Sequence, residues 1–283
     1  MLRFVLAAML AVAAMPVHAQ APDKASLQFE ASMLVTGSLD IETDGSVSAH
    51  AIDQEEKVPA YVTAIIGRAV GSWRFEPVIV DGVAVRARAR MTLRLLATPV
   101  GTDDLAVTLA SATFGEYDPK NSDYVTRVRM RAPDYPFFAL ERGATGTVYL
   151  LLKIDRKGRV AEAIAEQVNL DGVTDEETMA TLRKRFTESA LSVTHRWKFA
   201  PPTTGEYVDA PFWSLRVPVN FTMKRDEPGD ETYGKWTAYM PGPRQPAPWL
   251  QEEDPGANDA IASGTVQQTG TGYRLLTSLQ PDS

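Results

Sequence analysis

The sequence predicts an α+β fold of two tandem β-β-α-β modules, each a small antiparallel sheet with one packed helix. A turn between alternating strands occurs twice, at Thr43-Asp44-Gly45 and at Asp155-Arg156-Lys157-Gly158. An apolar helical stripe follows each turn and ends at a tryptophan, Trp73 or Trp197, and another alternating strand follows each tryptophan. A pattern that repeats in this order predicts a repeated supersecondary unit.

The first residues are typical of a secretory signal peptide. Arg3 precedes an apolar run from Phe4 to Ala14, and Val17-His18-Ala19 fits a small-residue cleavage site. We therefore predict a signal peptide over 1–19 and a periplasmic, exported protein. The alternative is an uncleaved anchor in the inner membrane, although the run is shorter than the roughly 20 apolar residues that a spanning helix needs.

Charge and cysteine content exclude several function classes. The formal net charge is −7, and removal of Arg3 with the leader changes it to −8. Such a balance argues against a nucleic-acid binder, which needs a basic surface. The chain has no cysteine, which excludes a disulfide framework, thiol catalysis and zinc–thiolate sites.

The first module is predicted over 27–114. Residues 38–42 and 46–51 form its hairpin, and the stripe from Tyr61 to Trp73 forms its helix. Residues 84–97 then alternate strictly, with apolar side chains on one face and arginines on the other. A further strand is predicted over 103–114.

Residues 115–134 are predicted to be a linker that contains a strand, 124–131. The second module, 135–223, begins with an apolar strand over 147–154 and a return strand over 159–168. Thr174 to Glu177 reads as a capping box at the start of a helix. The helix has one core-facing stripe at spacings of three and four: Met179, Leu182, Phe186, Ala190, Val193 and Trp197.

The last 60 residues differ in composition. Residues 224–283 are rich in Gly, Pro, Asp, Glu and Gln, and they show no sustained hydrophobic period. Because such a segment buries little apolar area of its own, we expect a disordered tail. Trp236, Tyr239 and Trp249 are the residues in it that we expect to attach to other surfaces.

The second module resembles a known family. Tyr135-Pro136, Gly146-Thr147-Val148, Gly158-Arg159-Val160, Trp197-Lys198-Phe199 and Val217-Pro218-Val219 occur in the order and spacing of the C-terminal domain of TonB-type energy transducers. The first module resembles a degenerate copy of it, with 28 residues from Gly45 to Trp73 where the second has 39 from Gly158 to Trp197.

The resemblance implies a non-enzymatic binding protein that pairs an edge strand with a peptide of an envelope or outer-membrane protein. An edge strand offers unpaired N–H and C=O groups to an extended peptide. The strand matching the family's pairing strand is 213–221, so the implied partner-binding residues are Trp213, Leu215, Arg216, Val217, Val219, Asn220 and Phe221. Edge strands of this kind also allow a dimer.

The alternative is a TonB-type energy transducer that drives transport through outer-membrane receptors. It requires the N-terminal segment to remain in the membrane as an uncleaved anchor. The family's long Pro-rich spacer before the domain is absent here, and the first module occupies that place.

Arginines suggest a second binding surface. Arg86, Arg88, Arg90 and Arg94 share one face of their strand, and Arg127, Arg129 and Arg131 share one face of another. If these strands pair, they form a basic ridge suited to an anionic partner. The alternative is a solvated face with acidic partners across the sheet.

Catalysis finds little support in the sequence, and we expect neither an enzyme, nor a metal site, nor a small-molecule cofactor. His50 and His195 are the histidines outside the leader, and neither has a metal-ligand spacing around it. No nucleophile elbow, phosphate-binding loop or dinucleotide fingerprint occurs. Sequence motifs do not reveal a catalytic site that is assembled from residues far apart in the sequence.

Overall fold

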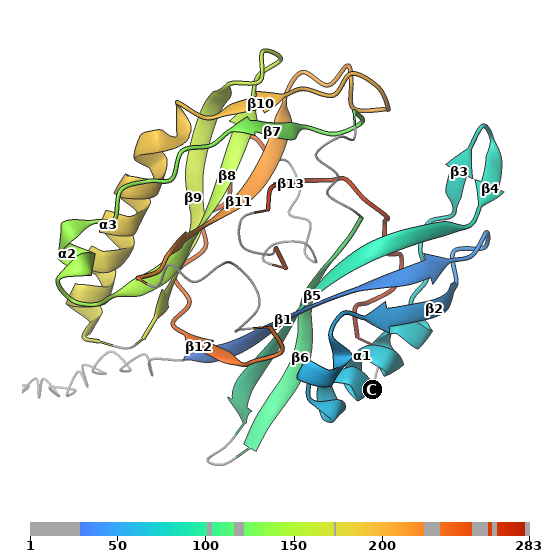
Figure 1. Ribbon diagram of the computed structural model, residues 1–283, viewed down its shortest axis with the longest axis horizontal. Helices are drawn as coiled ribbons and strands as arrows, with labels where there is room; N and C mark the ends of the chain where they lie inside the picture. The colour runs from blue at the N-terminus through green and yellow to red at the C-terminus, as the bar shows by residue number, and fades with distance from the viewer. Residues whose placement is uncertain are drawn as a thin grey trace, which may run out of the picture.

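The structure is a computed structural model, and it describes residues 29–100, 104–115, 122–172, 174–223, 233–250, 260–261 and 265–280. The chain has a mixed α+β fold with several small antiparallel sheets and few helices, as expected (Figure 1). The leader over 1–19 lies outside the described residues. None of the helices in the described ranges is long and apolar enough to cross a membrane.

The first lobe is a sheet covered by one helix. Its strands are β1 (Glu30–Ile41), β2 (Val47–Ile52), β5 (Ala87–Val100) and β6 (Asp104–Phe114), with β1 between β5 and β2. Helix α1 (Ala60–Ser72) buries Val62 and Ile66 against the alternating apolar side chains of β1 and β5. The short helix η1 (Glu55–Lys57) precedes α1, and a hairpin of β3 (Val78–Val80) and β4 (Val83–Val85) follows it.

The second lobe has a separate sheet and core. Strand β8 (Thr145–Ile154) lies between β9 (Val160–Asp171) and β11 (Trp213–Phe221), and all three are antiparallel. Helix α3 (Glu176–Thr194) packs on one face of this sheet, beside β9 (Figure 1). Helix α2 (Phe137–Leu140) precedes β8, and β7 (Thr126–Arg129) pairs with β10 (Lys198–Ala200).

Helix α3 forms as its stripe predicts, with one difference at its start. All six stripe residues are buried, from Met179 to Trp197. The N-cap, however, is Asp175, whose carboxylate accepts a hydrogen bond from the Thr178 N–H at 2.8 Å. Thr174 instead donates its hydroxyl to Asp175 at 3.2 Å. A carboxylate at the N-cap also interacts favourably with the helix dipole, which explains why it takes the capping position.

The two predicted turns, one in each lobe, accept an equivalent backbone hydrogen bond at their glycine. The N–H of Phe75 donates to the carbonyl of Gly45 at 2.7 Å, and the N–H of Phe199 donates to the carbonyl of Gly158 at 2.9 Å. Gly158 has φ of +70°, and a Cβ there would meet the carbonyl oxygen of Phe199. Glycine therefore fits where a side chain would be strained and would clash.

Residues 224–283 were expected to form a disordered tail. Those of them that the structure describes instead lie along both lobes. Strand β12 (Thr237–Tyr239) pairs with β1, and β13 (Gln267–Gln268) pairs with β11. Further on, Leu275 bridges Phe75 of the first lobe. The tail lacks a core of its own, but the sheet edges satisfy its backbone groups and its tyrosine and tryptophan side chains reach the lobes.

Candidate partner-binding edge

The family resemblance placed the partner-binding residues on β11, and the structure places most of them in the core. The side chains of Trp213, Leu215, Val217, Val219 and Phe221 are all buried in the second lobe's core cluster. Asn220 is exposed and accepts a hydrogen bond from the Thr147 hydroxyl at 3.0 Å. These five side chains therefore pack inward, because alternation along the strand directs them to the face that the helix covers.

Arg216 is also unavailable to a partner. It is 5% exposed and forms a two-pronged ion pair with Glu166 of β9, at 2.9 and 3.0 Å. The tail adds Arg244 at 3.9 Å from the same carboxylate. Since a buried charge needs a paired, hydrogen-bonded counter-charge, this arginine is structural.

The edge of β11 is closed by the chain itself. Strand β13 pairs with Leu215 and Arg216, and the N–H of Thr269 donates to the carbonyl of Ser214 at 2.9 Å. Backbone groups alternate along a strand, so Ser214, Arg216 and Pro218 direct theirs away from β8. Proline has no N–H, and a proline facing outward is a common way to blunt an edge.

The opposite edge, β9, carries another segment of the tail. Leu170 and Met240 exchange two backbone hydrogen bonds, at 3.1 and 2.8 Å, and the N–H of Gln245 donates to the carbonyl of Glu166 at 2.8 Å. The tail advances as β9 runs backward, so residues 240–245 lie antiparallel along this edge. This edge accepts an extended, proline-rich peptide.

Side chains and close packing fix the tail on β9. The Gln167 side-chain amide donates to the carbonyl of Gly242 at 3.0 Å, and Arg183 of α3 donates to the carbonyl of Pro241 at 3.2 Å. A Cβ on Gly242 would meet the carbonyl oxygen of Val168. The peptide therefore approaches β9 as closely as another strand would, with α3 supplying a clamp.

The rest of β9 is open. Among the described residues, no backbone hydrogen bond other than those to β8 is recorded for Ala161 to Ala165. The backbone groups of Ser214 point away from β8, and the pairing registers carry this alternation of N–H and C=O direction through β8 to β9. By this alternation Glu162 and Ile164 direct their backbone groups toward β8, while Ala163 directs its N–H and C=O outward.

A groove lies beside this open stretch. It has a volume of about 400 Å³ and is bounded by β9, α3 and the tail residues Pro243 and Gln245. Its apolar lining includes Ile164 and Leu191, and its polar lining includes Arg183, Lys184 and Glu188. An open edge next to a groove provides backbone pairing together with pockets for alternate side chains, which is the geometry of strand addition.

Three of the four predicted arginines, one just before β5 and two near its start, are paired with acids, as the solvated-face alternative requires. Arg86 binds Glu42 at 2.5 Å, Arg88 lies 3.5 Å from Asp40, and Arg90 binds Asp53 at 2.8 Å. Hydrogen bonds from Ser48 and from Arg86 lower the pKa of Glu42, and the hydrogen bond to Glu42 raises the pKa of Arg86.

Arg94 departs from the row. It is buried and donates to the hydroxyls of Ser32 and of Tyr149 from the second lobe, at 3.0 and 2.9 Å. The expected ridge is wrong as well, because β7 pairs with β10 and not with β5. Strand β5 pairs with β1 on one side and with β6 on the other, so it has no free edge for β7.

The histidines do not mark a metal site in the described residues. His50 is exposed on β2, and His195 is the C-cap residue of α3, where its Nε2 accepts a hydrogen bond from Arg196 at 3.2 Å. No group of three or more potential metal ligands occurs in the part of the chain that the structure describes.

Comparisons add no named relative: no family model, curated protein or solved structure matches this chain. The resemblance to the TonB C-terminal domain stays a prediction. Sequence reasoning missed the β9 edge, although the proline-rich run from Met240 to Pro248, typical of extended chain, is the signal that could have pointed to a self-bound peptide.

Proposed function

We propose that this chain is an exported, non-enzymatic binding protein that captures an extended segment of a cell-envelope protein by strand addition to β9. The observation that carries the proposal is the tail itself, which lies antiparallel on residues 166–170 of this edge and leaves 161–165 open beside a groove. A partner strand pairs with the open stretch and places alternate side chains in the groove.

The proposal moves the binding edge from β11 to β9. On β11 a partner would have to displace β13, and it would meet Pro218, which has no N–H to donate. On β9 it meets the outward N–H and C=O of Ala163 without displacing any described segment. The cost of binding is lower where no segment has to leave first.

We also propose that the two lobes are copies of one β-β-α-β module of the TonB C-terminal type. The matched contacts from Phe75 to Gly45 and from Phe199 to Gly158 support this relation. So does the shared order of hairpin, helix, tryptophan and closing strand. The envelope location is proposed from the predicted leader at 1–19.

The test uses peptide binding to the full chain. A phage library of random twelve-residue peptides is panned against the protein, and enriched peptides are titrated by fluorescence anisotropy. Ala163→Pro removes the outward N–H, and we expect affinity to fall at least about tenfold, since each lost backbone bond to a desolvated carbonyl costs about 1–3 kcal/mol.

The matched control is Ala163→Ser, which keeps the N–H and adds one hydroxyl. It should bind within about twofold of the native chain, which is under 0.5 kcal/mol. Circular dichroism checks that both variants are folded. Equal affinity of a folded Ala163→Pro variant, or a library that yields no binder, would contradict strand addition to β9.

A further inference from the structure

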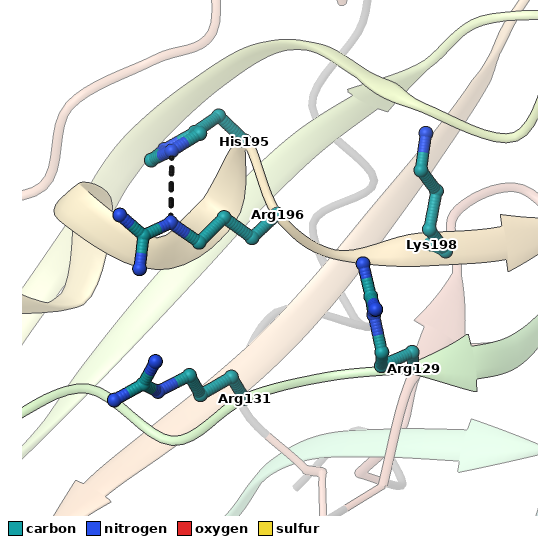
Figure 2. A pocket seen from close by; sticks show the side chains of 5 residues that line it. All are labelled: Arg129, Arg131, His195, Arg196 and Lys198. Carbon is teal, nitrogen blue, oxygen red and sulfur yellow. Dashed lines mark hydrogen bonds between the residues drawn. The ribbon is translucent and has the colours of Figure 1, made fainter.

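A basic hollow lies on the second lobe, apart from the β9 groove. It has a volume of about 430 Å³ and is lined by Arg129, Arg131, His195, Arg196 and Lys198. These residues come from β7 and the segment after it, from the end of α3 and from the start of β10. In Figure 2 the Arg131 and Arg196 guanidinium groups extend to the same side, and Arg129 rises toward Lys198.

The backbone holds these cations close together. Lys198 lies directly opposite Arg129 in the β7–β10 pair. The Trp197 indole N–H donates to the carbonyl of Arg131 at 2.8 Å, which fixes the segment after β7 against the end of α3. Like charges placed across a strand pair repel one another, so the fold keeps an unfavourable cluster here.

No carboxylate lines this hollow. Among the described residues, the side chains of Arg129, Arg131 and Lys198 form no recorded ion pair or hydrogen bond, and Arg196 donates to His195. Arg86, Arg88 and Arg90 are exposed too, yet each has a carboxylate within 4 Å. The chain has a net charge of −7, so a cluster of four cationic side chains without an acidic partner among the described residues is unexpected and calls for an explanation.

The dipole of α3 accounts for only part of the cluster. Cations near the C-terminal end of a helix are stabilised, and this explains Arg196. It does not explain Arg129, Arg131 and Lys198, which belong to the strands and the segment that follows β7. Their convergence on one hollow indicates a ligand that brings negative charge.

We propose that the hollow binds a phosphate group. A phosphate monoester carries up to two negative charges and three acceptor oxygens, which match several donors at once, whereas one carboxylate offers two oxygens and one charge. Arginine forks bind such oxygens in pairs, and Lys198 contributes a single strong donor. The phosphate comes from a soluble compound or from a lipid headgroup, and the test separates these sources.

Binding is measured on the full chain at low ionic strength. Isothermal titration calorimetry follows inorganic phosphate, and sedimentation follows phosphatidylcholine vesicles with and without phosphatidic acid. The double variant Arg129→Gln/Lys198→Gln should lose phosphate affinity at least about tenfold, because two of the four cations are removed. Binding of phosphate alone identifies a soluble source, and binding of phosphatidic acid vesicles identifies a lipid source.

The control is Arg86→Gln/Arg88→Gln, which removes the same charge from exposed arginines that already have acidic partners. It should keep affinity within about twofold. Binding of neither phosphate nor phosphatidic acid vesicles would overturn the proposal. An equal loss in the two double variants would also overturn it, because net charge and not the hollow would then govern binding. Neither result depends on peptide binding at β9.

Discussion

The two edges of the second lobe's sheet are both contacted by the chain's own tail, but to different extents. On β11 the strand β13 pairs at two positions, and the neighbouring side chains lie in the core or in the buried Arg216–Glu166 pair. On β9 the tail covers only residues 166–170, and the remainder borders a groove. The β11 edge is part of the folded core, whereas the stretch of β9 beyond the tail is free to pair with another peptide.

This difference shows that alternation alone does not identify a binding edge. A strand that is apolar on one face is predicted equally well in the centre of a sheet, beneath a tail or at an open edge. What distinguishes the two edges is the set of unpaired backbone groups, and that set depends on residues more than 40 positions away along the chain. Three changes test how far the two edges differ.

The largest expected effect concerns the β11 edge. Arg216→Met leaves the buried Glu166 carboxylate without its main partner, so the free energy of unfolding should fall by about 3–5 kcal/mol in urea titrations. The double variant Arg216→Met/Glu166→Leu removes both charges and should recover most of this loss. A single variant as stable as the native chain would show that the pair is not structural.

A smaller effect should be confined to the β9 edge. A methyl group on Gly242 would collide with the carbonyl of Val168, so Gly242→Ala should release the tail from β9. We expect amide exchange at Leu170 to accelerate about tenfold or more, as for a bond exposed by local opening. Amides of β11 should keep their native rates.

The control for this change is Gly71→Ala, whose added Cβ meets nothing within 4 Å. It should leave exchange at Leu170 unchanged. If Gly242→Ala altered exchange at β11 and β9 alike, the tail would act as one unit and the two edges would not be independent.

The smallest effect is the pH dependence of the helix that flanks the groove. The backbone N–H of Thr178 donates to Asp175 and lowers its pKa below the ordinary 3.8. A lowered pKa means that the stabilisation is present above the unfolded value and is lost as pH falls through the folded value. Asp175→Asn should therefore have a slightly lower Tm than the native chain at pH 7, and this difference should shrink as the pH falls below 3.8. A Tm difference that stays constant as the pH falls would contradict this role.

The sequence predicted the local elements well because their signals are local. The two turns, the buried stripe of α3 and the strand over 213–221 need only short-range alternation and spacing, and all are present. The partners of these elements were harder to predict. Pairing of β7 with β10, and closure of β11 by Gln267 and Gln268, join segments that lie far apart in sequence.

The candidate site was less predictable for the same reason. The carboxylates that pair with Arg86, Arg88 and Arg90 come from β1, from the turn after it and from the loop after β2, which alternation does not reveal. The open stretch at Ala163 has no distinctive composition. Its openness follows from where the tail leaves β9, after Gln245, and from a bulge opposite Tyr149 and Leu150.

The most direct test of strand addition to β9 is residue-resolved amide exchange of the full chain, with and without a peptide enriched by panning. We predict that bound peptide slows exchange of the outward amides of Ala163 and Ala165, while the amides of Ser214 and Arg216 on β11 keep their rates. Slowed exchange on β11, with no change at Ala163, would place the binding edge on the other side of the sheet and contradict the proposed function.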